Sequence, residues 1–409
     1  MNAATATPAA LSLRVNMAWT LVGNLAQAAA QWAVVVVLAR MGNVETVGAY
    51  ALALAIVSPV FLFANMHLRT VLSTDVTGET GIGVYFSLRL ATSAATLCLL
   101  LAAALYWGGF EGFVLAGLAL AKAFEAISEL LYGELQRQER MDRIGKSMIL
   151  RAVGSLAAVA AAMRLTQNLP LAVFSMAVIS AAVAASDMRS TGVLRMSGTL
   201  QEIKRLAVSA APLGLLLLLV SLNAAIPRYF LAGMASPAAV GVFAALSYVS
   251  IALNTLVMAA GQASGASMAR SFWSRDASAF LRKSSRLVGL SIVLGLAGLA
   301  AAATCGEDFL LALYGPAYAA EHAAFLWLMA AGAVSFAASA LGYAMSAARC
   351  FLPQVPTLAA TAVVTAICCR LWVPQSGVAG AAMAQTSGFA AQLLLSLWLL
   401  GYFSWRKFQ

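Results

Sequence analysis

The sequence predicts an all-α, polytopic integral membrane protein with twelve transmembrane helices, arranged as two six-helix bundles. Three observations support this prediction: twelve apolar stretches, connecting loops that alternate between strongly basic and nearly uncharged, and an internal repeat. Of the 409 residues, 62% are hydrophobic and only 10% are charged. Soluble domains have about 25% charged residues, so the composition favours a lipid bilayer as the surrounding medium.

The apolar stretches define the expected helices. Most have about the 20 residues that a helix needs to cross a hydrocarbon core of about 30 Å, and helices satisfy their backbone amides without water. The first stretch is too long for a signal-peptide core, so we expect an uncleaved span. The expected spans are 17–39, 46–66, 84–106, 113–135, 147–163, 170–186, 207–230, 240–262, 287–304, 323–346, 357–373 and 378–401.

The distribution of basic residues predicts the orientation. Of the 25 Lys and Arg residues, 20 fall on the side of the expected spans that holds the N-terminus, and only 4 fall on the other side. Basic residues gather on the cytoplasmic side of membrane proteins, so we expect both termini in the cytoplasm. That arrangement requires an even number of spans and favours twelve over eleven. It also explains the net charge of +10 without any nucleic-acid partner.

A repeat divides the chain in two. The segments Leu38–Gly42 and Val47–Ala51 recur 193 residues later as Leu231–Ala235 and Val240–Ala244. The copies lie six spans apart and therefore share one membrane orientation, as in transporters built from parallel repeats. We therefore expect an N-terminal bundle at 1–186, a cytoplasmic linker at 187–206 and a C-terminal bundle at 207–409. A transport pathway is expected between the bundles.

The fourth expected span carries charge inside the membrane. Lys122, Glu125, Glu129 and Tyr132 share one helix face. A charge at the bilayer centre costs about 2.5–3.5 kcal/mol on insertion scales, and such residues usually face a cavity or a partner. One interpretation is a coupling site in a cavity, with H⁺ or Na⁺ as the candidate ion. The other is a structural Lys122–Glu125 pair, with Glu129 bonded to another helix.

Neutral polar residues follow the same helical spacing in three other spans. Side chains of this kind either line a wet cavity or hydrogen-bond one helix to another, and the sequence leaves both open. They are Asn24, Gln27 and Gln31 in the first span, Ser247, Ser250 and Asn254 in the eighth, and Ser335, Ser339 and Ser346 in the tenth.

Arginines near the span ends are candidates for a phosphate contact, because the guanidinium fork matches phosphate oxygens. The alternative for each is snorkelling to the membrane surface. Arg89 and Arg228 lie just inside apolar runs and are the best of the set. The candidates are Arg228, Arg89, Arg40, Arg69 and Arg151.

Several function classes lack sequence support. There is no P-loop, so direct use of ATP is not expected. Only two histidines are present, so we expect neither a His-based metal site nor a cofactor. No external loop is long enough for a catalytic domain, so the chain is not expected to be an enzyme. An integral-membrane polysaccharide polymerase or ligase is kept as the least favoured hypothesis.

Four loose motifs carry a resemblance to a known family. The chain resembles the Wzx-type polysaccharide and O-antigen flippases of the multidrug/oligosaccharidyl-lipid/polysaccharide (MOP) exporter superfamily, and the similarity of architecture covers the whole chain. The motifs are Asn16-Met17-Ala18-Trp19; Leu38-Ala39-Arg40-Met41-Gly42 with Val47-Gly48-Ala49-Tyr50; Leu68-Arg69-Thr70-Val71-Leu72 with Asp75, Tyr85 and Arg89; and Pro227-Arg228-Tyr229-Phe230-Leu231-Ala232-Gly233 with Val240-Gly241-Val242-Phe243.

The resemblance implies a MOP/MATE-like fold, with two six-helix bundles around a central cavity in the bacterial inner membrane. It implies movement of undecaprenyl-pyrophosphate-linked oligosaccharide to the outer face for surface polysaccharide or exopolysaccharide biosynthesis. Cationic cavity residues would meet the pyrophosphate, and Arg228 and Arg89 match arginines at these motif positions. Membrane lipids and polysaccharide-assembly proteins are the implied partners. A drug/cation antiporter of the same superfamily is the alternative, which the charged fourth span fits equally well.

Overall fold

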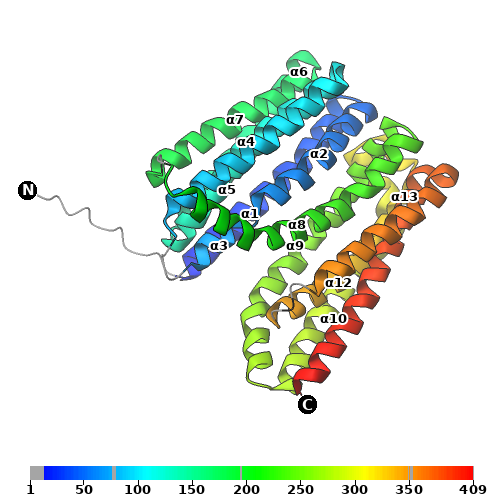
Figure 1. Cartoon of the computed structure of the whole chain (residues 1–409). Coiled ribbons are helices and arrows are strands. Elements are labelled where there is room, and N and C mark those ends of the chain that lie inside the picture. The colour runs from blue at the N-terminus through cyan, green and yellow to red at the C-terminus, as the bar shows by residue number, and fades with distance from the viewer. Residues whose placement is uncertain (1–12, 76–79, 194–195, 349, 351–352, 409) are drawn as a thin grey trace, which may run out of the picture. The chain divides into compact units, whose positions relative to one another are not determined.

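A computed structural model describes residues 13–75, 80–193, 196–348, 350 and 353–408. Throughout these residues the regular structure is helical (Figure 1), which confirms the predicted all-α class. Residues 1–12 of the expected first bundle and 194–195 of the expected linker lie outside the described ranges. The helices are α1 (Leu13–Met41), α2 (Val44–Asn65), α3 (Leu68–Thr74), α4 (Ile82–Trp107), α5 (Gly109–Arg137), α6 (Met141–Thr166), α7 (Leu169–Thr191), α8 (Leu200–Met234), α9 (Pro237–Trp273), α10 (Ala277–Leu313), α11 (Pro316–Ala319), α12 (His322–Ala347) and α13 (Gln354–Phe408).

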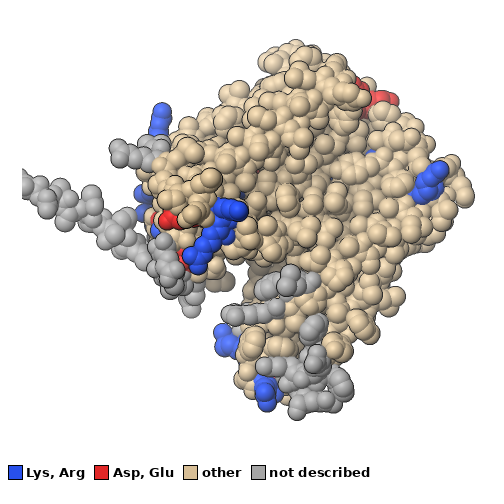
Figure 2. Space-filling model, viewed as in Figure 1, with Lys and Arg blue, Asp and Glu red and all other residues tan. Residues whose placement is uncertain are grey.

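Length and composition make this a multi-pass membrane protein. Ten helical segments in the described ranges are long and apolar enough to cross a bilayer. Twelve spans are consistent with these ten segments. The 29-residue helix α5 is long enough to be an eleventh span but contains more charged residues than the others, and α13 consists of two helices joined at a kink, which gives the twelfth. Figure 2 shows few charged side chains on the face it presents. Large apolar side chains such as Leu105, Val178 and Leu394 are exposed, as contact with lipid requires.

The kink in α13 lies at Gly377, where the backbone adopts φ 52° and ψ −122°, a conformation that side chains disfavour. The expected boundary between the last two spans, at 373–378, falls at this residue. A side chain on Gly380 would meet the carbonyl oxygen of Trp372, and one on Gly388 would meet the Thr365 hydroxyl. Positions after the kink thus pack against positions before it in reverse order, so α13 is a helical hairpin.

Contacts between residues divide the chain into two compact units. Unit 1 comprises residues 1–34 and 60–217, and unit 2 comprises residues 35–59 and 218–409. The ranges differ from the expected bundles, because residues 35–59 pack with unit 2 and residues 207–217 pack with unit 1. In the expected linker, α7 continues to Thr191 and α8 begins at Leu200.

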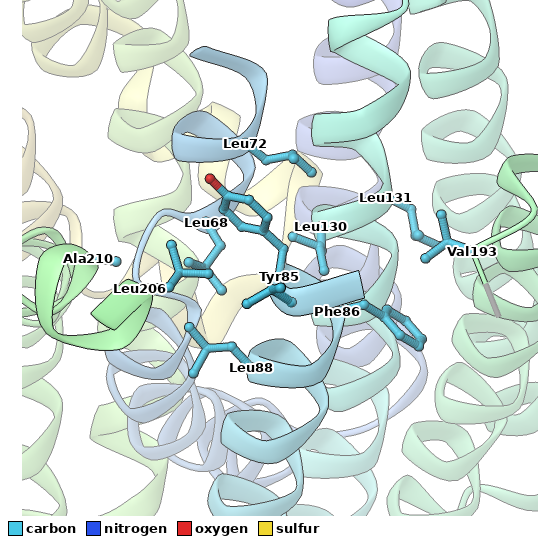
Figure 3. Packing of buried hydrophobic residues seen from close by; sticks show 11 residues of the cluster. Leu68, Leu72, Tyr85, Phe86, Leu88, Leu130, Leu131, Val193, Leu206 and Ala210 are labelled. Atoms are coloured by element: carbon cyan, nitrogen blue, oxygen red, sulfur yellow. The ribbon is translucent and has the colours of Figure 1, made fainter. Parts of the chain in front are cut away.

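The core of unit 1 anchors the short helix α3. Leu68 and Leu72 of α3 are fully buried against Tyr85 and Leu88 of α4 and Leu130 of α5, and residues from the start of α8 complete the cluster (Figure 3). A side chain on Gly133 would meet the Arg69 carbonyl oxygen at 2.9 Å, so this glycine lets α3 lie directly on α5. The apolar packing thereby places Arg69 beside the charged face of α5.

In unit 2 the two copies of the repeat contact each other. A side chain on Gly48 would lie 2.0 Å from the Pro237 carbonyl oxygen, and one on Gly241 would lie 2.2 Å from the Val44 carbonyl oxygen. These two contacts are equivalent under the 193-residue offset. The starts of α2 and α9 therefore cross reciprocally at paired glycines, which accounts for the packing of residues 35–59 within unit 2.

Candidate functional site

Unit 1 contains a network of charged residues on one face of α5. Lys122 Nζ lies 2.7 Å from Glu125 Oε2, and Gln27 of α1 donates a hydrogen bond of 3.2 Å to Glu125 Oε1. One turn further along, Arg69 Nη1 lies 3.4 Å from Glu129 Oε2. The expected Lys122–Glu125 pair is therefore present, and Glu129 has a partner on another helix. These carboxylates have the contacts that the structural interpretation required.

The same face continues into a second, more deeply buried part. The guanidinium groups of Arg69 and Arg151 both lie over the ring of Tyr132, with Cζ atoms 5.5 and 5.7 Å from its centre. The Tyr132 hydroxyl hydrogen-bonds to Ser147 Oγ at 2.7 Å, and Ser147 donates to Asp187 Oδ2 at 2.8 Å. The network thus extends from α3 through α5 and α6 to α7.

Arg151 is the least satisfied member of this network. It is 6% exposed, and neither Nη1 nor Nη2 has a hydrogen-bond partner among the described residues. The carboxylates of Glu125, Glu129 and Asp187 interact with it electrostatically. A buried cation with unused donors among several carboxylates can bind an anion or stabilise a carboxylate that loses its proton.

Two other candidate arginines are held by carbonyl groups. Arg89 is 1% exposed, and its terminal nitrogens donate to the side-chain and backbone oxygens of Asn65. Arg40 is exposed at the end of α1 and donates to the carbonyls of Leu311, Ala312 and Leu313. Those carbonyls end α10, where helices lack internal donors, so Arg40 caps that helix. Both guanidinium groups therefore have protein partners, and of Arg89 only the buried Nε lacks one among the described residues.

Unit 2 encloses a cavity of about 300 Å³. The polar stripes of the expected eighth and tenth spans meet here, with the exception of Ser346. Nine polar residues from α8, α9, α12 and α13 line it: Asn223, Arg228, Ser247, Ser250, Asn254, Ser335, Ser339, Gln385 and Gln392. Among these described lining residues, Arg228 is the one charged group.

The polar groups of the cavity are incompletely hydrogen-bonded. Arg228 is 8% exposed and its Nε has no partner among the described residues. The Oδ1 atoms of Asn223 and Asn254 are buried and likewise lack donors in the described part of the chain. Buried polar groups are nearly always paired, so three such atoms around one cavity point to a missing polar ligand or to water.

The remaining expected site residues divide between the two units. Gln27 lies in the unit 1 network and Asn254 lines the unit 2 cavity. Asn24 and Gln31 are exposed on α1. Sequence reasoning did not select Ser147 or Asp187. Asp187 stood in the expected linker, whereas the structure buries it in α7.

The sequence analysis also did not identify Asn223, Gln385 and Gln392, which line the unit 2 cavity. Gln385 and Gln392 are seven residues apart and therefore share a helix face, and this spacing is the signal that could have found them, whereas Asn223 lies five residues from Arg228 and on a different face of a regular helix. Within the described residues, no group of three or more His, Cys, Asp and Glu side chains is placed to hold a metal ion.

Comparisons with known proteins agree with this architecture. No known family profile matches the sequence. The chain is 24% identical over 311 residues to the capsular polysaccharide biosynthesis protein CapF of Staphylococcus aureus, covering 74% of this chain and 78% of CapF.

Solved structures share the fold. The lipid II flippase MurJ, in an inward closed conformation, matches with a TM-score of 0.78 and 9% identity over 94% of this chain and 87% of MurJ. An inward-facing multidrug resistance MATE family transporter of the MOP superfamily matches with a TM-score of 0.72 and 12% identity over 95% of each chain. The chain is therefore a multi-pass helical membrane protein with the fold seen in these MOP-superfamily transporters.

Proposed function

We propose that this protein is a flippase that moves an undecaprenyl-pyrophosphate-linked oligosaccharide across the bacterial inner membrane for surface polysaccharide assembly. The observation that carries the proposal is the cavity of unit 2, where Arg228 Nε and the Oδ1 atoms of Asn223 and Asn254 lack partners among the described residues. Intramembrane ionisable residues of this kind usually mark a substrate pathway. The shared fold and the similarity to a capsule biosynthesis protein support a lipid-linked sugar as substrate.

In this proposal Arg228, which lines the unit 2 cavity, is the main contact for an anionic group of the substrate. Its Nε has no hydrogen-bond partner among the described residues, and no protein oxygen is recorded as holding its guanidinium group there. Arg69, Arg89 and Arg40 are secondary contacts, since each must first release a protein acceptor. Lipids surround the helices, and polysaccharide-assembly proteins receive the product.

The test is reconstitution of the full chain in liposomes that contain a fluorescent lipid-linked oligosaccharide. Movement to the other leaflet is measured by quenching or enzymatic modification of the exposed sugar. Protein-dependent movement is expected, and it should decrease in Arg228→Gln but not in Arg370→Gln, which alters an exposed arginine of the same unit. Absence of movement with several lipid-linked donors would refute the proposal.

A drug/cation antiporter is the second candidate, and the unit 1 network favours it. Glu129 is partly exposed and is held by one ion pair of 3.4 Å, so it can exchange Arg69 for a proton or for Na⁺. Dye efflux that follows an imposed pH or Na⁺ gradient, and that is lost in Glu129→Gln, would favour this function. If a lipid-linked sugar is moved instead, the same network is the proposed coupling site of the flippase.

A further inference from the structure

The cavity of unit 2 requires a ligand that both donates and accepts hydrogen bonds. Arg228 is a donor only, whereas Asn223 Oδ1 and Asn254 Oδ1 are acceptors. All three groups line one cavity, and the atoms Arg228 Nε, Asn223 Oδ1 and Asn254 Oδ1 lack partners within the described residues. A bare anion would satisfy the arginine and leave both amide oxygens unpaired. A neutral polyol would satisfy the amides and leave the buried charge unbalanced.

The orientation of Asn223 is determined by the protein. Its Nδ2 donates to the carbonyl oxygens of Leu219, at 2.9 Å, and Leu358, at 3.0 Å. Because both amide protons are used, Oδ1 is the free end, and the side chain cannot rotate without losing two hydrogen bonds. Asn223 therefore presents a fixed acceptor at the cavity, which suits a hydroxyl group.

The charge of the cavity limits the charge of its ligand. Arg228 is the one cation among the described lining residues, and no carboxylate lines the cavity. An uncompensated charge in this environment costs several kcal/mol, as a rough estimate. A ligand group with one negative charge balances Arg228, whereas a pyrophosphate carries more charge than the lining can neutralise.

Size and surface point to a sugar. The cavity volume of about 300 Å³ is at the small end of ligand pockets, which span about 300–1,000 Å³. Apart from Arg228 its polar lining consists of hydroxyl and amide groups, and the rings of Phe336 and Phe389 complete the wall. Neutral hydrogen-bonding groups beside aromatic rings suit a compact polyol with apolar faces.

We propose that the unit 2 cavity binds one sugar residue that bears a single carboxylate, a uronic acid, with the carboxylate on Arg228 and hydroxyl groups on Asn223 and Asn254. This inference rests on the proposed function, because it identifies the part of the lipid-linked substrate that this cavity selects. If this inference is correct, the pyrophosphate of the substrate does not bind at Arg228.

The binding test uses the full chain in lipid nanodiscs and isothermal titration with three soluble probes: methyl glucuronide, methyl glucoside and inorganic pyrophosphate. The glucuronide should bind about tenfold or more tightly than the glucoside, the effect of one charge-assisted hydrogen bond. Arg228→Gln should remove this difference, and Arg370→Gln should preserve it. Equal binding of the two glycosides, or tighter Arg228-dependent binding of pyrophosphate, would overturn the proposal.

Asn254→Asp gives a second variant of nearly unchanged shape. Its carboxylate would compete for Arg228 and should weaken glucuronide binding more than glucoside binding, with the melting temperature as a check on folding. If this variant binds both probes as the parent does, the proposed contacts are wrong.

The flippase assay separates the two proposals. Movement of neutral and uronate-containing lipid-linked sugars at equal rates, without selective glucuronide binding, would overturn the inference and leave the flippase function intact. Selective glucuronide binding without any lipid-linked transport would support the carboxylate site and overturn the flippase function.

Discussion

In unit 1 the carboxylates of Glu125 and Glu129 on α5 form ion pairs, whereas the unit 2 cavity leaves Arg228 facing neutral groups. The four ion pairs recorded among the described residues all belong to unit 1: Arg69–Glu129, Lys122–Glu125, Arg137–Glu134 and Arg140–Asp142. In unit 2 the lining of the cavity contains one cation and no acid.

The difference indicates two kinds of polar site. A paired network satisfies itself and changes state when one partner gains a proton or an ion, which suits energy coupling. A cation that faces only neutral groups in a cavity can bind an anionic ligand, which suits substrate recognition. We therefore propose coupling for unit 1 and sugar recognition for unit 2. Three substitutions test this proposal, and a pair of glycine substitutions tests which unit contains residues 35–59.

The largest effect is expected from Glu125→Ala in unit 1. It leaves the Lys122 ammonium without its partner at 2.7 Å and Gln27 without its acceptor. Both side chains of the ion pair are partly buried, at 26% and 18% exposure, and leaving the Lys122 charge without its partner costs about 3 kcal/mol, so thermal unfolding in detergent should begin at a lower temperature. Glu111→Ala, at an exposed position of the same helix, is the control. Equal melting temperatures for the two variants would show that the pair is unimportant for stability.

Arg228→Gln in unit 2 should have the opposite effect on stability. It removes a buried charge that no carboxylate balances, so the melting temperature should stay the same or rise. Transport of the lipid-linked sugar should decrease by about ten- to a hundredfold, the value of a charge-assisted contact of about 1.5–3 kcal/mol. A variant that is both unstable and inactive would make Arg228 a structural residue and would remove the contrast between the units.

Gly48→Ala and Gly241→Ala test the assignment of residues 35–59 to unit 2. Each added methyl group would lie within 2.2 Å of a backbone carbonyl oxygen of the other repeat copy. Overpacking of this kind costs about 1–3 kcal/mol, and the two losses should be similar because the contacts are equivalent. Gly233→Ala, where nothing lies within 4 Å, should be near neutral. Markedly unequal losses would mean that the crossing is not reciprocal.

Glu129→Gln should have the smallest effect on stability. Its pair with Arg69 is long at 3.4 Å, and both side chains are about a quarter to a third exposed. Loss of this pair should therefore lower the free energy of unfolding by only about 0.5–1 kcal/mol. Transport driven by an ion gradient should nevertheless fall while membrane expression stays normal. Unchanged gradient dependence would exclude Glu129 as a coupling group, and lost expression would make the carboxylate structural.

The sequence predicted the helices well because lipid imposes a simple rule on them. The expected break between the last two spans coincides with the kink at Gly377, and the repeat offset pairs the two glycines that meet in unit 2. The face of α5 was also predictable, since helical spacing alone determines which residues lie above one another.

Helical periodicity could not predict which residues on other helices contact this face of α5. Asp187 joins Tyr132 through Ser147, and this chain of contacts depends on how three helices pack. Arg40 and Arg228 look alike in sequence, yet one caps a helix and the other faces a cavity. The difference is set by which acceptors tertiary structure brings within reach, and neighbouring residues in the chain do not encode it.

The kink at Gly377 has a consequence for the far end of the chain. An unbroken helix of the 55 residues in α13 would be about 80 Å long, whereas the hydrocarbon core is about 30 Å thick. Such a rod would carry its second half far out into water and would end on the side opposite to its start. By turning the helix back on itself, the kink at one glycine keeps the second half within the thickness of the membrane and returns the end of α13 to the side on which α13 begins.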